Sequence, residues 1–227
     1  MVRIVKDADE RRDELLDTAL ALFLDHGYER TSVEQITATV GVAKGTFYHY
    51  FATKQELLEQ LVERFTEQLF AEITSAVETT GGDAIARFQT LVAASSTSKI
   101  GRRDETLLVT RSLYSDDNRQ MLYRMREGWI DQTRPLIADI IERGCAEGVF
   151  DVPDVAAFAE VCLSLWFDFG IRIGRLFFEV QAEPSRAAEV QSAMSALVSS
   201  VERVLGAAPG SLTVDVGPAF DAIMGSG

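Results

Sequence analysis

The stretch from Thr31 to Lys54, TSVEQITATVGVAKGTFYHYFATK, contains two short helical patterns that are joined by a turn. Thr31 and Glu34 form an S/T-x-x-E capping box, in which the hydroxyl and the carboxylate each accept a hydrogen bond from a backbone amide at a helix start. We therefore expect the first helix to begin at Ser32 and to last about two turns. Gly41 then supplies the permissive backbone that lets the chain turn. Two short helices in this arrangement are typical of a helix-turn-helix.

The second helical pattern, residues 43–51, has one apolar face and several faces that carry polar groups. Phe47 and Phe51 lie four residues apart, so both are predicted to face the core. The other faces carry an ammonium, a hydroxyl and three polar rings, from Lys44, Thr46, Tyr48, His49 and Tyr50. These groups donate hydrogen bonds to phosphate oxygens or base acceptors. The pattern therefore favours a surface that binds nucleic acid.

The sequence around this stretch has the motif order and spacing of a known family. It contains the blocks LLDTALALFLDHG, GYERTSVEQI and VAKGTFYHYFATKQEL. With these blocks, the segment from Arg11 to Leu61 resembles the DNA-binding domain of the TetR family of transcriptional repressors. A second capping box, T-K-Q-E at residues 53–56, is expected to start the helix that follows.

The resemblance implies a role for each polar residue of the segment. It implies phosphate contacts for Thr31, Tyr48, Tyr50 and Lys54, and it places Lys44, Gly45, Thr46 and His49 at the major groove. Ala52 stands where many members of the family have a lysine, which removes one possible phosphate contact. Taken singly, each tyrosine or lysine is more often a packed ring or a solvated charge. Their combination in this order favours double-stranded DNA as the partner.

The net charge of the chain is −13, which is unusual for a protein that binds nucleic acid. Residues 41–54, however, contain no carboxylate. We expect this local surface to face the phosphates, while the acidic remainder repels DNA and orients the protein. Affinity for non-specific DNA should be weak and should depend steeply on salt.

The remaining composition is that of a cytoplasmic globular protein. The N-terminus carries no apolar secretory signal, and no apolar run reaches the ~20 residues that a membrane span needs. Cys145 and Cys162 lie in separate helical patterns without metal-ligand spacing, so we expect free, buried thiols and keep a redox pair as the alternative. Neither a metal nor a cofactor is expected.

Helical patterns continue almost throughout the rest of the chain, which predicts an all-α fold. The expected helices cover residues 54–77, 83–96, 104–114, 117–147 with a kink at Pro135, 154–180 and 185–205. The predicted domains are a helix-turn-helix DNA-binding domain at 8–54, a helical ligand-binding and dimerisation domain at 55–206 and a C-terminal tail at 207–227. The tail is expected to hold at most a turn of helix near 218–224.

The last two helices are predicted to form a four-helix bundle with their copies in a homodimer. One has apolar residues in a four-three spacing that is typical of paired helices, and the other is apolar on more than one face. The candidate interface residues are Phe158, Leu165, Phe169, Val190, Met194, Leu197, Val201 and Val204. Packing within one chain is the alternative. A dimer, which the resemblance also implies, would present two recognition helices to a palindromic operator.

The middle helices supply candidates for the effector pocket that the resemblance implies. The candidates are Phe88, Leu91, Leu108, Tyr114, Met121, Met125, Trp129, Cys162 and Trp166. Flexible methionines beside aromatic rings suit adaptable binding, although plain core packing is the alternative. Asp168 and Arg172 are interpreted as an exposed ion pair, or else as a polar anchor for a ligand.

These features predict a ligand-responsive DNA-binding transcriptional regulator, a repressor that a small apolar or amphipathic molecule releases from its operator. One alternative is a protein-interaction module with the same fold, against which the intact polar set at 44–54 argues. An enzyme is the other alternative. His26 and His49 are the only histidines, and neither lies in a pattern that forms a catalytic dyad.

Overall fold

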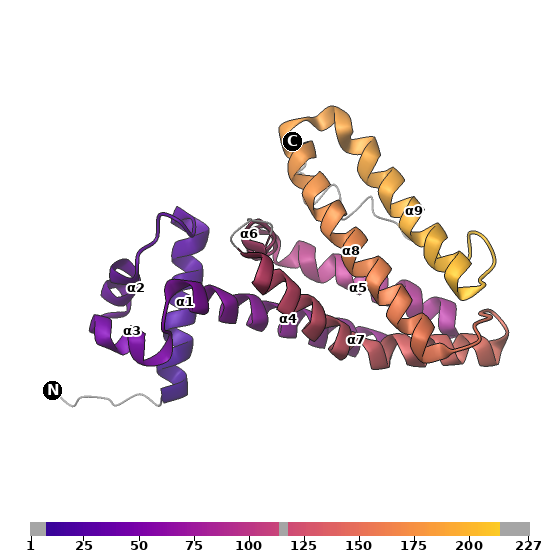
Figure 1. Cartoon of the computed structure of the whole chain (residues 1–227), viewed down its shortest axis with the longest axis horizontal. Coiled ribbons are helices and arrows are strands. Elements are labelled where there is room, and N and C mark those ends of the chain that lie inside the picture. Colours follow the sequence, from indigo (N-terminus) through magenta and orange to yellow (C-terminus); the bar gives the residue numbers. More distant parts are fainter. Residues whose placement is uncertain (1–7, 114–117, 214–227) are drawn as a thin grey trace.

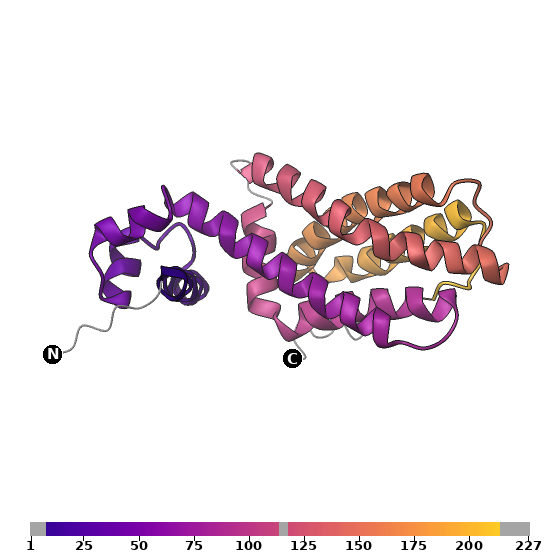
Figure 2. The same cartoon turned by 90° about the horizontal axis from the view of Figure 1, so that it is seen from below.

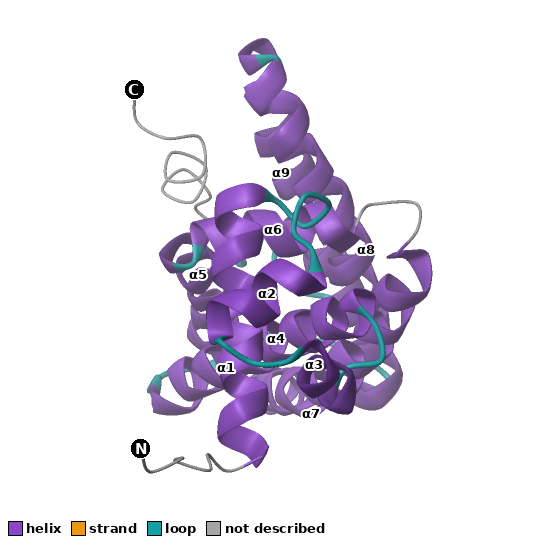
Figure 3. Cartoon of the chain, turned by 90° about the vertical axis from the view of Figure 1, so that its left-hand side faces the viewer, coloured by secondary structure: helices purple, strands orange, loops and turns teal. Residues whose placement is uncertain are grey.

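The computed structural model describes residues 8–113 and 118–213, and every regular element in these ranges is a helix (Figures 1 and 3), which confirms the all-α prediction. The α-helices are α1 (Ala8–His26), α2 (Val33–Val40), α3 (Lys44–Tyr50), α4 (Lys54–Thr79), α5 (Ala84–Gly101), α6 (Arg103–Leu113), α7 (Arg119–Glu147), α8 (Val155–Ala182) and α9 (Ala187–Leu205), with a 3-10 helix η2 (Pro184–Arg186) before α9. Tyr114 and the helical turn predicted near 218–224 lie outside the described residues.

Helix α4 belongs to both parts of the molecule. Helices α1, α2 and α3 form a compact unit at one end, and α4 runs from this unit into the larger group formed by α5 to α9 (Figures 1 and 2). The 26 residues of α4 span about 39 Å at 1.5 Å per residue. A displacement of α4 in the larger group therefore reaches the N-terminal unit.

The N-terminal unit is held together by fully buried apolar side chains from α1, α2, α3 and the first turn of α4. They are Leu15, Leu16, Ala19, Phe23, Ile36, Phe47, Phe51, Leu57 and Leu58. Full burial of one such large side chain stabilises a fold by about 1.5–3 kcal/mol. Because Phe47 and Phe51 point into this core as predicted, α3 presents its polar faces outwards.

The helix cap before α2 differs from the prediction by one residue. Ser32 is the N-cap, and its hydroxyl and the Gln35 side chain form the capping box. The Thr31 side chain is buried instead, because its hydroxyl donates to the carbonyls of Gly27 at 2.9 Å and Leu22 at 3.3 Å. Helix α2 accordingly begins at Val33 rather than at Ser32.

The turn after α2 and the start of α4 follow the predicted chemistry. Gly41 ends α2 in the left-handed region at φ 77°, which favours glycine. The Thr53 hydroxyl accepts a hydrogen bond of 3.0 Å from the Glu56 amide and caps α4. The Glu56 carboxylate accepts from the amide of Ala52 at 2.7 Å, one residue before the partner that a capping box predicts.

Helices α5 and α7 differ from the predicted patterns only in detail. Helix α5 continues to Gly101, past the predicted end at residue 96, and the hydroxyl of Thr106 in α6 donates to the Lys99 carbonyl of its last turn at 3.0 Å. Pro135 lies inside α7, and the helix is continuous across it.

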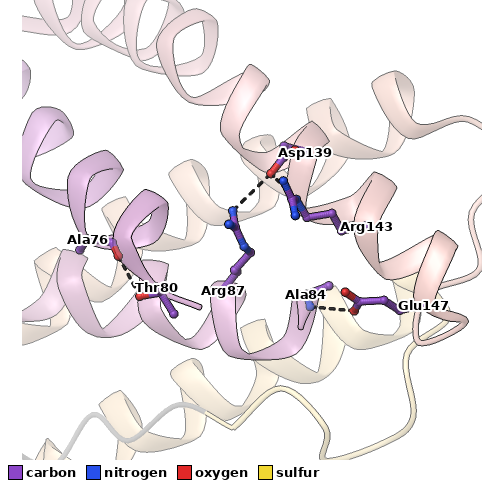
Figure 4. A network of polar contacts seen from close by, with 7 residues as sticks. All are labelled: Ala76, Thr80, Ala84, Arg87, Asp139, Arg143 and Glu147. Atoms are coloured by element: carbon purple, nitrogen blue, oxygen red, sulfur yellow. Dashed lines mark hydrogen bonds and ion pairs between the residues drawn. The ribbon is translucent and has the colours of Figure 1, made fainter. Parts of the chain in front are cut away.

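Polar contacts join the α4–α5 turn to the end of α7 (Figure 4). The Glu147 carboxylate accepts a hydrogen bond of 2.8 Å from the Ala84 amide at the first residue of α5. One oxygen of Asp139 lies 3.4 Å from Arg87 of α5 and 2.9 Å from Arg143 of α7. These contacts link α5 to α7.

Three residues of the four-three seam of α9, which was predicted to face a second chain, pack inside their own chain. Val190, Leu197 and Val201 are 1–2 % exposed, and α9 packs against α8 of the same chain. The spacing identified a paired helix, and within the single chain its partner is the preceding helix, α8. Within the described ranges, no helix combines the length and the apolar composition of a membrane span.

Candidate nucleic-acid interface and ligand pocket

Helix α3 places four of the predicted DNA contacts on an open surface. Lys44, Gly45, Tyr48 and His49 are exposed, whereas Thr46 and Tyr50 are half-buried. Tyr48 is 49 % exposed although it is a large ring, and its edge-to-face contact with the buried Phe47 fixes the direction in which it points. A Cβ added at Gly45 would meet no atom within 4 Å, so the close approach of another molecule would explain a glycine here.

The exposed ammonium of Lys44 forms an ion pair with the Glu34 carboxylate of α2. The hydrogen bond to Glu34 raises the pKa of Lys44, and the same bond lowers the pKa of Glu34. Lys44 also lies 5.9 Å from the centroid of the Tyr48 ring. A phosphate or base acceptor that binds Lys44 must therefore compete with Glu34.

Lys54 connects the start of α4 to the turn between α1 and α2. Its ammonium donates to the carbonyls of Tyr28 at 2.8 Å and Thr31 at 2.9 Å, and it lies 4.2 Å from the centroid of the Tyr28 ring. An ammonium has three donors, so one remains for a phosphate. Thr31 is 1 % exposed, and its hydroxyl already donates a hydrogen bond to the Gly27 carbonyl. To contact a phosphate, the hydroxyl would have to give up this hydrogen bond.

A chain of side-chain hydrogen bonds leads from the same turn into the larger group of helices. The Tyr28 hydroxyl donates to Gln55 Oε1 at 3.0 Å, and Gln55 Nε2 donates to Asn118 Oδ1 at 2.6 Å. Asn118 is buried before the first turn of α7, and its Nδ2 donates to the Ser112 carbonyl in α6 at 2.7 Å. The N-terminal unit is thus in polar contact with both α6 and α7.

The larger group encloses a mainly apolar pocket of about 210 Å³, with walls from α4 to α9. Six of the predicted ligand residues line it: Phe88, Leu91, Met125, Trp129, Cys162 and Trp166. Phe88 meets Trp166 edge to face with centroids 6.2 Å apart, and Trp129 lies 5.5 Å from Phe167. Burial raises the pKa of the Cys162 thiol to about 12, so this thiol stays protonated.

Two predicted ligand residues lie elsewhere. Leu108 borders a groove beside α1. Its neighbour Val109 lines the pocket, and successive residues of a helix point in different directions. Met121 borders a separate groove between α4 and α7, one turn before Met125. Asp168 lies 3.6 Å from Arg126 of α7, rather than in the predicted pair with Arg172.

Sequence reasoning missed the contribution of α4 and one charged residue. Helix α4 lines the pocket with Phe65, Thr66, Leu69, Phe70 and Ile73, and its apolar spacing could have indicated this. Lys99 of α5 also lines the pocket, and no pattern in the sequence marks it.

The outer face of α8 remains open in the single chain. A shallow groove there is lined by Ala157, Glu160, Val161, Ser164, Leu165, Asp168 and Phe169. Val161 is 46 % exposed, which is high for a large apolar side chain. The predicted interface residues Phe158, Met194 and Val204 are half-buried.

The chain matches known regulators over its N-terminal unit and, in longer alignments, over 59–66 % of its length. The family described as bacterial regulatory proteins, tetR family, matches residues 15–61. The chain is 29 % identical over 154 residues to the HTH-type transcriptional repressor KstR2 of Mycobacterium tuberculosis, covering 66 % of this chain and 74 % of the relative. It is 30 % identical over 135 residues to the HTH-type transcriptional repressor DhaR of a Mycobacterium species, covering 59 % and 68 %.

Solved structures share the fold. A transcriptional regulator FadR from Bacillus subtilis, in complex with stearoyl-CoA, aligns with a TM-score of 0.60 at 18 % identity, over 82 % of this chain and 97 % of that one. A putative TetR-family regulator from Syntrophomonas wolfei aligns with a TM-score of 0.58 at 22 % identity, over 86 % and 96 %. The chain is a helix-turn-helix transcriptional regulator, and it belongs to the TetR family.

Proposed function

We propose that this protein is a cytoplasmic, homodimeric repressor that binds a palindromic operator and leaves it when a small apolar or amphipathic molecule enters the pocket. The single observation that carries the proposal is that α4 is both a wall of the pocket and the helix that begins at the DNA-binding unit. The proposed division is a DNA-binding domain at 8–54, a ligand-binding and dimerisation domain at 55–206 and a tail at 207–227.

The exposed faces of α3 support the DNA-binding half of the proposal. Lys44, Tyr48 and His49 present an ammonium, a phenol and an imidazole to solvent without burying them. Such groups bind phosphates and base edges. In the proposed complex, Tyr50 and Lys54 contact the backbone, with Thr31 at the same edge, while Gly45 and Thr46 approach the major groove.

The open face of α8 supports the dimer. Phe158, Leu165 and Phe169 lie along this helix with the exposed Val161, and Met194 and Val204 of α9 remain accessible in part. A symmetric pair of α8 faces would cover the apolar groove. Two copies of α3 would then meet half-sites about one turn of DNA apart, about 34–36 Å.

The position of α4 supports the ligand response. Filling the pocket moves the side chains of α4 that line it, and α4 begins at the Lys54 contacts with the α1–α2 turn. A ligand that binds one spacing of the two α3 helices more tightly shifts the dimer away from the spacing that fits DNA. A coupling free energy of about 1–3 kcal/mol would lower the affinity for DNA roughly five- to 150-fold.

The test is fluorescence anisotropy with labelled DNA from immediately upstream of the gene, in the presence of random competitor DNA and over a series of salt concentrations. Competitor-resistant binding of two chains per site is expected. A folded protein that shows no sequence preference at any salt concentration would contradict the proposal and favour the interaction module.

A further inference from the structure

Lys99 is the one charged residue among the described residues that line the pocket. The aromatic part of the wall comes from Phe65, Phe70, Phe88, Trp129, Trp166 and Phe167. Lys99 and Phe88 both lie on α5, eleven positions apart, which corresponds to about 16 Å at 1.5 Å per residue. Lys99 therefore lies about one ligand length from the Phe88 part of the aromatic wall.

The Lys99 ammonium has no partner in the part of the chain that the structure describes. Among the described residues, no carboxylate pairs with the ammonium and no group accepts a hydrogen bond from it, although the Lys99 carbonyl accepts one from Thr106. The side chain is accessible to water, as expected for a residue that borders a cavity, yet the surrounding protein desolvates the ammonium and lowers its pKa. Water can solvate this ammonium in the open pocket, and an anion that enters would replace that water with a charge-assisted hydrogen bond.

Ser95, one turn before Lys99 on α5, offers a neutral hydroxyl, whereas the threonine hydroxyls in this part of the pocket already donate within the protein. Thr66 and Thr110 line the pocket beside Lys99, and their hydroxyls donate to carbonyls of their own helices at 2.8 Å and 2.6 Å. The Thr106 hydroxyl is used by the Lys99 carbonyl. Lys99 is thus the strongest donor that these side chains offer to a bound molecule.

We infer that the effector is an amphipathic anion, with an apolar body between the aromatic side chains and one carboxylate paired with Lys99 at the α5–α6 end of the pocket. A neutral hydrophobe would fill the aromatic region and leave the ammonium unpaired. An organic cation would place a second positive charge beside Lys99. The inference rests on the proposed function only in taking this pocket as the effector site.

The experiment compares dodecanoate, 1-dodecanol and dodecylamine, which share one apolar chain and differ in charge. Both tryptophans of the protein, Trp129 and Trp166, line the pocket, so intrinsic fluorescence reports binding in the absence of DNA. Wild-type protein should bind the carboxylate about 10- to 100-fold more tightly than the alcohol, and the amine most weakly.

Variants assign this preference to one side chain. Lys99→Met keeps the length of the side chain and should remove the preference, with affinity for the alcohol changed less than about twofold. Lys99→Arg should retain the preference. Arg203→Met removes one positive charge from an exposed position of α9 that does not line the pocket, and it should behave as the wild type.

Three results would overturn the inference. The first is wild-type affinity for the alcohol that equals or exceeds affinity for the carboxylate. The second is an equal loss of affinity for both ligands in Lys99→Met, and the third is no binding of any saturated acid from octanoate to hexadecanoate. The wild-type comparison needs no variant to fold. Because the titration contains no DNA, a protein without the carboxylate preference could still be a repressor that responds to neutral effectors. Likewise, the absence of operator binding would not contradict the assignment of the effector as an amphipathic anion.

Discussion

The amide nitrogen of Gln55 donates a hydrogen bond of 2.6 Å to the amide oxygen of Asn118, which connects the first turn of α4 to the start of α7. Asn118 is 6 % exposed, so water does not readily replace this contact. The Tyr28 hydroxyl and the Ser112 carbonyl extend it in both directions. The contact gives the ligand-binding helices a second route to the DNA-binding unit, in addition to α4 itself.

Asn118→Leu should weaken the coupling between effector and operator. The substitution removes both hydrogen bonds of Asn118 and leaves Gln55 and the Ser112 carbonyl without this partner. We expect a loss of stability of about 1–3 kcal/mol and a two- to 30-fold smaller effect of ligand on DNA affinity, on the order found for residues between coupled sites. Anisotropy with and without dodecanoate measures this ratio. A ratio equal to that of the wild type would show that Asn118 only stabilises the fold.

Lys44→Ala combined with Tyr48→Phe should abolish specific operator binding. Both side chains are exposed on α3, and neither belongs to the core, so the fold and the oligomeric state should not change. Fluorescence anisotropy measures operator binding, and analytical ultracentrifugation measures the oligomeric state. Loss of the dimer in this variant would contradict the proposed division between residues 8–54 and 55–206.

Glu34→Gln should strengthen DNA binding. The Glu34 carboxylate holds the Lys44 ammonium in the unbound protein, and the substitution removes both this competitor and one negative charge near the phosphates. We expect affinity to rise about two- to fivefold at low salt and to approach that of the wild type at high salt. Glu29→Gln, which changes the same charge in the turn before α2, is the control. Weaker binding by Glu34→Gln would mean that the carboxylate positions Lys44 for DNA.

Val161→Glu should convert the dimer into a folded monomer. The side chain is exposed at the centre of the α8 groove, where a symmetric interface would bury two like charges together. Sedimentation should give the monomer mass, circular dichroism should retain the helical signal, and operator binding should fall with dimerisation. Tyr123→Glu on α7 is the matched control, because Tyr123 is 65 % exposed and does not line this groove. A dimeric Val161→Glu protein would place the interface on another face.

Cys145 should react with a thiol reagent well before Cys162. Burial disfavours the thiolate of Cys162 and raises its pKa to about 12, so at pH 8 almost none of the reactive form is present, whereas Cys145 is half-buried. One thiol per chain should react in the folded protein, and a second after denaturation. Cys145→Ser should leave no rapidly reacting thiol. Rapid reaction of that variant would indicate that the pocket opens frequently.

Local patterns predicted the DNA-binding unit well, because its helices are short and their signals lie within the same few residues. Phe47, Phe51 and Gly41 have the positions that spacing and backbone freedom required. The cap of α2 was shifted by one residue because Thr31 and Ser32 can both cap a helix. Contacts of Thr31 with the α1–α2 turn, distant from the pattern itself, decide between them.

Features that depend on the relation between helices were less predictable. The spacing of Val190, Leu197 and Val201 required a partner helix, but it could not distinguish α8 of the same chain from a helix of a second chain. Leu108 and Met121 are apolar residues of the kind that line pockets. Leu108 lies one residue before Val109, which lines the pocket, and Met121 lies one turn before Met125, which also lines it. A single lysine, Lys99, carries no periodic signal, so only the assembled pocket reveals its place.

The pocket also means that the unliganded repressor is an incompletely packed protein. Side chains of six helices leave a space of about 210 Å³ unfilled, and an empty cavity in a protein core costs on the order of 24 cal/mol per Å³. A molecule that occupies the space takes the place of missing core side chains. Detection of the signal would then amount to completing the hydrophobic core, and the form that represses transcription would be the less stable of the two.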